Sequence, residues 1–140
     1  MALLRVFSMI VAALAGVFLV SRGERASGQR PQLQMLGKLA DGQWELRRRD
    51  GAGAQRLCVK DRIRLIQLRH PDLSCDRIVL EDTPTSVTVQ YTCRGRGYGR
   101  THIRRESGQL IQLDTQGIAD GLPFEFSAEG RRVGECSSQG

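Results

Sequence analysis

The chain has 140 residues, which leaves room for one domain and an N-terminal targeting segment and excludes a second large domain. Its formal net charge is +6, but from Gln29 onward it holds 18 basic and 14 acidic residues, a net charge of about +4. So modest an excess indicates a solvated basic surface, with weak attraction to an anionic lipid or polysaccharide surface as the alternative.

Residues 1–28 have the pattern of a signal peptide. After one early charge, Arg5, comes a run of fifteen mostly apolar residues at positions 6–20. A membrane-spanning helix needs about twenty such residues, whereas this length suits the core of a signal peptide. Small residues at 26–28 predict cleavage after Gly28, and an uncleaved membrane anchor is the alternative. In either case we expect the domain to be exported, to the periplasm or out of the cell.

Two segments have helical patterns. In the N-terminal arm, residues 29–40, leucines recur three residues apart, which fits either a short helix or an extended arm. Residues 61–70 predict one short helix, because Asp61 can cap its first turn and Pro71 ends it. His70 would then lie at the helix end as a polar cap rather than as a catalytic base.

Alternation of apolar and polar residues predicts strands over most of the remaining chain. The most regular pattern covers residues 85–93, where β-branched and aromatic side chains share one face, and we expect this strand to be central. Trp44, the only tryptophan, is predicted to pack in the core because its ring buries a large area. Further strands are predicted at residues 43–49, 55–60, 75–82, 97–105, 109–116, 122–128 and 131–136.

Turn signals separate the C-terminal strands about every ten to twelve residues, including one at Glu129 and Gly130 between the last two strands. This spacing is typical of hairpins in an antiparallel meander. The predicted fold is therefore mainly β: a curved antiparallel meander sheet (partial barrel) of six to eight strands with one short helix and two disulfides. It would occupy residues 41–136, and residues 137–140 would form a polar tail.

The four cysteines all lie beyond the leader: Cys58, Cys75, Cys93 and Cys136. An even number in a short exported chain predicts two disulfides. Their separations of 17, 18 and 43 residues disfavour a zinc site, because sites built from four cysteines use close pairs. Of the three possible connectivities we favour Cys58–Cys75 with Cys93–Cys136, since the first pair is local and the second joins two strand ends.

Catalytic and cofactor-binding patterns are scarce. His70 and His102 are 32 residues apart without a metal-ligand spacing, and we expect His102 on a solvent-exposed strand face. No serine lies in a G-x-S-x-G context. The sequence thus predicts no catalytic residue, no metal and no cofactor, and we expect the protein not to be an enzyme. The arginine- and glycine-rich residues 94–100 fit a hairpin turn, so nucleic acid is not an expected partner.

Several short pieces occur here in a fixed order: the opening strand Asp-Gly-Gln-Trp-Glu-Leu at 41–46, the four-cysteine frame, Tyr-Thr-Cys at 91–93 and Arg-Arg-Val-Gly-Glu-Cys at 131–136. Together, over residues 39–136, they resemble the bacterial domain-of-unknown-function family numbered 3617. The segment after Cys58 departs from the family in lacking small, acidic residues. The resemblance implies a small exported protein of Gram-negative bacteria, with no established activity and no catalytic residues.

These observations favour a non-enzymatic binding or structural module of the periplasm or cell envelope. Its concave sheet face would hold an apolar or envelope-derived ligand, or dock a protein, through residues such as Ile111, Phe124 and Phe126. One alternative is a small envelope enzyme, hydrolase-like, in which His70 or His102 meets a carboxylate or a hydroxyl. A second is binding to an anionic glycan or lipid surface through the basic residues 94–105.

Overall fold

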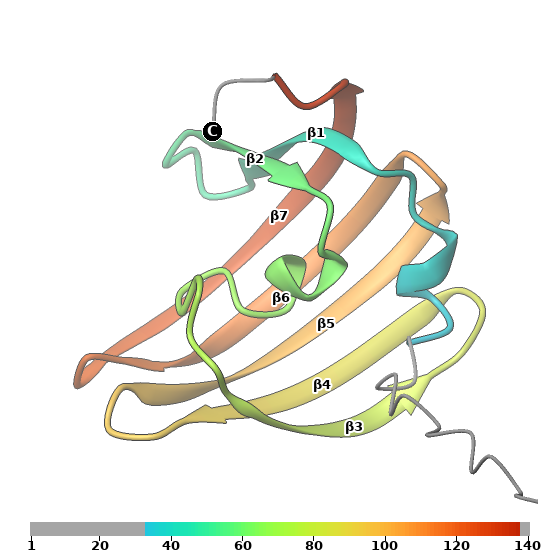
Figure 1. Ribbon diagram of the computed structural model, residues 1–140. Coiled ribbons are helices and arrows are strands. Elements are labelled where there is room, and N and C mark those ends of the chain that lie inside the picture. The colour runs from blue at the N-terminus through green and yellow to red at the C-terminus, as the bar shows by residue number, and fades with distance from the viewer. Residues whose placement is uncertain (1–32, 138–140) are drawn as a thin grey trace, which may run out of the picture.

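The structure, a computed structural model, describes residues 33–137. It confirms a mainly β fold with a single antiparallel sheet of seven strands (Figure 1). The predicted signal peptide with its cleavage site, the start of the N-terminal arm and residues 138–140 of the tail lie outside the described residues. The strands are β1 (Gly42–Arg48), β2 (Ala54–Val59), β3 (Asp76–Asp82), β4 (Ser86–Cys93), β5 (Gly97–Ser107), β6 (Leu110–Ala119) and β7 (Leu122–Gly134).

The strand order is β2-β1-β7-β6-β5-β4-β3, so the five C-terminal strands form a meander and the β1–β2 hairpin is added beside β7. The sheet curves but does not close, and β2 and β3 are its two edges. The expectation that residues 85–93 form the central strand is wrong: β4 lies next to the β3 edge, and β6 is central. Local alternation in β4 could not reveal that β1 pairs with β7.

The last two predicted strands are one strand, β7. The turn expected at Glu129 and Gly130 does not exist, because Gly130 is a buried position opposite Ile111 in β6 and Leu46 in β1. A Cβ atom at Gly130 would lie 2.7 Å from a carbon of Ile111 and 2.8 Å from a carbon of Leu46. Glycine is therefore needed here for close packing rather than for a change of direction.

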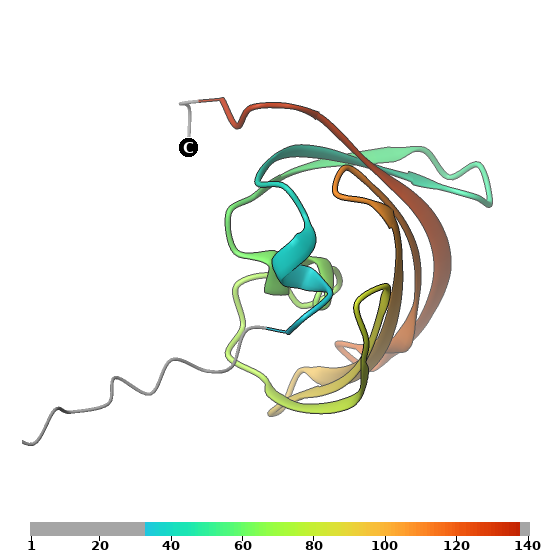
Figure 2. The ribbon, with the colours of Figure 1, turned by 90° about the vertical axis from the view of Figure 1, so that its right-hand side faces the viewer.

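The concave face of the sheet is the core, and it is covered from inside by two short 3-10 helices, η1 (Leu36–Lys38) and η2 (Arg62–Leu65). Figure 2 shows both lying within the curve of the sheet. Trp44 is fully buried, as predicted, and its Nε1 donates to the carbonyl of Ala40 at 3.0 Å. Thr101, also buried, donates to the carbonyl of Ile66 at 2.7 Å and so fixes the segment after η2 to the sheet.

The helix predicted at residues 61–70 is the shorter η2. Asp61 caps it as expected, accepting a hydrogen bond from the backbone of Ile63 at 3.1 Å. The helix does not continue to His70, because the chain turns at the buried Gln67. The Gln67 amide donates to the carbonyl of Leu73 at 3.0 Å and holds the following loop in place.

Two disulfides are present, Cys58–Cys136 and Cys75–Cys93, and no cysteine of the described chain is free. The favoured connectivity is therefore wrong. Strand register decides the pairing: Asp76 lies opposite Thr92, which places the adjacent cysteines of β3 and β4 together. Similarly, Gln43 pairs with both Cys58 and Gly134, which brings Cys136 alongside. Two disulfides fit a protein of an oxidising environment.

Candidate functional site

The β3 edge carries an exposed apolar stretch. Ile78, Val79 and Leu80 are consecutive, and their exposed fractions are 63%, 48% and 50%. They are three of only six large hydrophobic residues that are exposed between residues 33 and 137. An edge strand already presents unpaired backbone N–H and C=O groups, and proteins commonly protect such strands with charge or proline. Here the centre of the strand has neither, which makes it a candidate binding site.

The local geometry of β3 accounts for this exposure. Ile78 lies opposite Gln90 and Val79 opposite Val89, but the register then shifts, and Glu81 lies opposite Thr88. Leu80 is thus an extra residue without a partner in β4, as in a β-bulge. Val89 is buried on the concave face, so Val79 faces inward and Ile78 faces the convex side. The apolar stretch is therefore accessible from both sides of the edge.

Both ends of β3 are held by hydrogen bonds. At the start, the Arg77 guanidinium donates to the Gln67 side-chain oxygen at 2.6 Å. At the end, the Asp82 carboxylate accepts from the backbone N–H groups of Gln34, at 2.7 Å, and Met35, at 3.2 Å. Because its ends are fixed, β3 presents its exposed centre in a defined extended conformation.

A cavity of about 600 Å³ adjoins this edge. Residues of β3 line one side of it, and the segment after β2, η2 and η1 line the other. The cavity therefore occupies the gap that the unclosed sheet leaves between its two edges. Its apolar lining includes Leu33, Leu36, Ile63 and Val79.

Charged residues also line the cavity: Lys60, Asp61, Asp76 and Arg77. Arg62, which also lines it, is held in the protein: its guanidinium donates to the Leu39 carbonyl and forms an ion pair with Asp41 at 2.8 Å. A lining that combines apolar side chains with charges of both signs suits an apolar side chain carried by a polar backbone.

The apolar patch expected on the concave face does not form. Ile111 is fully buried in the core. Phe126 and Phe124 are half-buried, and arginines cover their rings: Arg48 lies 4.6 Å from the centroid of Phe126, and Arg69 lies 5.8 Å from that of Phe124. The concave face is thus filled by the protein's own residues, and the remaining space lies at the edge.

His70 is buried, contrary to the expected position at a helix end, because the loop after η2 folds over the sheet. Its Nε2 lies 3.2 Å from the carbonyl of Arg96, and its Nδ1 lies 3.2 Å from the Tyr91 hydroxyl. A carbonyl only accepts, so in the neutral ring Nε2 carries the proton and Nδ1 accepts from the hydroxyl. Burial raises the pKa of Tyr91 to about 12. These contacts give His70 a structural role.

His102 lies on the convex face, half-buried, in a row across four strands: Thr88, His102, Asp114 and Ser127. His102, Asp114 and Ser127 line a second cavity of about 300 Å³. His102 Nδ1 lies 2.9 Å from the Thr88 hydroxyl, whereas Ser127 donates to Asp114. A catalytic triad needs histidine between the hydroxyl and the carboxylate. Within the described chain, Asp114 accepts from Ser127 and has no hydrogen bond or ion pair with His102, so the histidine is not linked to the carboxylate as a triad requires.

Three of the five arginines in residues 94–105 form ion pairs in the described chain, one of them Arg94 with Asp76 at 3.8 Å. Arg96 pairs with Asp120 at 2.7 Å, and this hydrogen bond lowers the pKa of the Asp120 carboxyl. Arg104 pairs with Glu106 at 3.0 Å. Such pairing reduces the positive charge that this stretch offers to an anionic polymer, with Arg100 and Arg105 left outside the ion pairs of the described chain.

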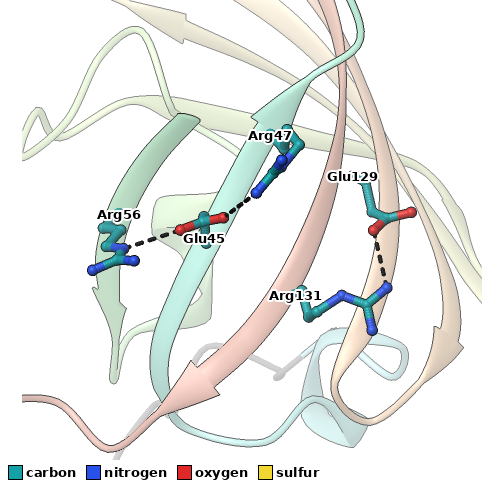
Figure 3. A network of polar contacts seen from close by, with 5 residues as sticks. All are labelled: Glu45, Arg47, Arg56, Glu129 and Arg131. Carbon is teal, nitrogen blue, oxygen red and sulfur yellow. Dashed lines mark hydrogen bonds and ion pairs between the residues drawn. The ribbon is translucent and has the colours of Figure 1, made fainter. Parts of the chain in front are cut away.

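The same mixing of charge continues on β1, β2 and β7 (Figure 3). There, Glu45 accepts from Arg47 and Arg56, both at 3.0 Å, and these hydrogen bonds lower its pKa. On β7, Arg131 pairs with Glu129 at 3.1 Å. These charges fit a solvated surface.

In residues 33–137, no three His, Cys, Asp or Glu side chains are grouped so that they could hold a metal ion. None of the helices in this part of the chain is long and apolar enough to cross a membrane. Comparisons with family models, curated proteins and solved structures found no match. The resemblance to the family numbered 3617 therefore stays a prediction, and the candidate site rests on the geometry of the β3 edge.

Proposed function

We propose that this chain is an exported, non-enzymatic binding module of the cell envelope that takes an extended polypeptide segment as an additional strand along β3. The observation that carries the proposal is the exposed Ile78-Val79-Leu80 edge beside a cavity of about 600 Å³. Export is supported by the signal-peptide pattern at residues 1–28 and by the two disulfides.

An added strand uses both features of the site at once. Its backbone would pair with the free N–H and C=O groups of β3, which give affinity in strand addition, while alternate side chains give specificity. Side chains on one face of the added strand would enter the cavity beside Val79 and Ile63. Those on the other face would cover Ile78 on the convex side. The ligand is therefore an extended segment with apolar side chains at alternate positions.

The other candidate functions have weaker support. A ligand in the concave face would have to displace core residues, and an enzyme would need a contact between His102 and Asp114 that the described chain does not make. An anionic surface would meet a stretch in which three arginines are already ion-paired. Each would require a rearrangement of contacts that the described chain already makes. Strand addition requires none, because the edge and the cavity are already accessible.

Random peptides displayed on phage provide a test without a known ligand. We expect selection on the oxidised protein to enrich peptides with alternating apolar residues. Their binding should fall roughly tenfold or more when Val79→Pro removes a backbone donor and a side chain from the edge. Leu122→Ala, which removes an exposed apolar side chain at the start of β7 and away from the site, is a control for nonspecific effects provided that both variants retain their disulfides. Absence of enrichment, or equal binding by Val79→Pro, would contradict the proposal.

A further inference from the structure

The β3 strand is complementary to itself. From Asp76 to Asp82 it reads Asp-Arg-Ile-Val-Leu-Glu-Asp, with three apolar residues at the centre and charged residues at both ends. When two such strands run antiparallel about Val79, their apolar centres lie side by side, with Val79 beside its own copy. Opposite charges also come near each other, since the end that carries Arg77 in one strand lies beside the end that carries Glu81 in the other.

The charges at the ends favour this pairing without requiring direct ion pairs. Arg77 lies opposite the buried Tyr91 and Glu81 opposite Thr88, so the two side chains are on different faces of the sheet. The attraction between Arg77 of one copy and Glu81 of the other therefore acts between the strand ends, and it favours the antiparallel orientation of the two strands. The outermost pair, Asp76 with Asp82, would be repulsive. However, Asp82 already accepts two backbone hydrogen bonds, and Asp76 lies 3.8 Å from Arg94.

We propose that the segment added to β3 is the β3 strand of a second copy of this chain, giving a symmetric dimer with a sheet continuous across both molecules. This inference rests on the proposed function, since it names the occupant of the same edge. With a two-fold axis at Val79, the outward backbone N–H and C=O groups of each β3 strand would hydrogen-bond to those of the other. Both copies would thus use the same surface, as in the isologous interfaces of most homodimers. Each apolar centre is covered by the other, and each copy's Val79 lies beside its partner at the mouth of the cavity.

The dimer is expected to dissociate on dilution. Stable complexes bury about 1,200–2,000 Å² in total, and two paired edge strands alone bury less. Nor does the β2 edge offer an equivalent surface, because no large hydrophobic residue of β2 is exposed. The association should therefore stop at two copies rather than extend into a filament.

Sedimentation velocity of the oxidised protein over a wide concentration range tests this inference. We expect a monomer–dimer equilibrium whose dissociation constant rises roughly tenfold or more in Ile78→Lys, because lysine at the centre of an edge repels its own copy. Leu122→Lys is the matched control: Leu122 is 71% exposed, lies in the β6–β7 turn and should leave the dimer unchanged. Circular dichroism and disulfide mapping establish that each variant is folded.

A synthetic peptide with the sequence of residues 76–82 provides the second measurement. It should dissociate the dimer, whereas a scrambled peptide of equal composition should not. A dimer that Ile78→Lys and the peptide leave intact would overturn the inference, because another surface would then hold it. If the wild-type protein is monomeric at every concentration while phage-selected peptides still bind β3, this inference fails and the proposed function stands. If neither the dimer nor any peptide binding is found, both fail.

Discussion

The two edge strands of the described sheet, β2 and β3, differ in how they are protected against pairing with another chain. At β2, the outward side chains are short or charged, and Arg56 is held by Glu45, while Leu57 and Val59 turn into the core. At β3, Ile78 and Leu80 are exposed. A protected edge is the usual means of preventing unwanted strand pairing, so the contrast supports the proposal that β3 binds a partner.

Each edge is fixed by one disulfide, and the two should differ in what they contribute. Cys58–Cys136 joins residues 78 apart and Cys75–Cys93 residues 18 apart. On the chain-entropy model, replacing both cysteines of a pair with serine costs roughly 4.5 kcal/mol for the first and 3 kcal/mol for the second. Urea unfolding of Cys58→Ser/Cys136→Ser and Cys75→Ser/Cys93→Ser measures the difference. A larger loss from the second double variant would contradict this ranking.

Tyr91, next to the β3 edge, should make the stability fall at alkaline pH. Burial raises its pKa to about 12 in the folded protein, whereas a tyrosine exposed in the unfolded chain has the ordinary pKa of about 10. The folded state therefore keeps a proton that the unfolded state loses. The contribution of Tyr91 to the free energy of unfolding is fully present below pH 10. It declines by roughly 2–3 kcal/mol as the pH rises to about 12.

Urea unfolding of the wild-type protein and of Tyr91→Phe between pH 8 and about 12 measures this effect, since phenylalanine cannot ionise. The variant should lose about 1 kcal/mol at neutral pH with the hydrogen bond to His70. It should then show a smaller alkaline decline than the wild-type protein. Parallel pH profiles would show that another group is responsible.

Close packing at Gly130 should contribute to the stability of the half of the sheet that ends at β2, because Gly130 lies where β7 contacts β1. In Gly130→Ala the new methyl group would press on Ile111 and Leu46, so we expect a loss of about 1–3 kcal/mol in unfolding free energy. Gly134→Ala is the control in the same strand, because a Cβ there has no atom within 4 Å. Equal effects of the two substitutions on the urea midpoint would exclude the packing explanation.

The smallest expected effect on stability is at the β1–β2 turn, which leads into the protected edge strand β2. Hydrogen bonds from Arg48 and from the backbone of Ala52 lower the pKa of Asp50 to about 2. Its contribution is therefore present above pH 3.8 and is lost as the pH falls to about 2. Because the group is exposed, Asp50→Asn should change the acid unfolding profile only slightly, and NMR titration of the carboxyl is the direct check. An ordinary pKa for Asp50 would contradict the contacts described.

Local sequence patterns predicted the elements well where packing and turns act through neighbouring residues. The alternation in residues 85–93 gives β4, and Asp61 gives the capped start of η2. The same reasoning failed at Gly130, since a glycine needed for close packing has the same local sequence signal as a glycine in a turn. The candidate site was only partly predictable: the sequence indicates a strand at residues 75–82, but not that one side of it is unpaired.

By itself, the sequence determined a mainly β, hairpin-built domain with four cysteines, because alternation and turn residues act over a few positions along the chain. Only the tertiary structure decided which cysteines pair, which strand is central and which edges are free. These properties depend on β1 pairing with β7 and on the register between β3 and β4, which join residues far apart in the chain. An isolated strand pattern contains no information on what lies beside it, and the function proposed here depends on that neighbour.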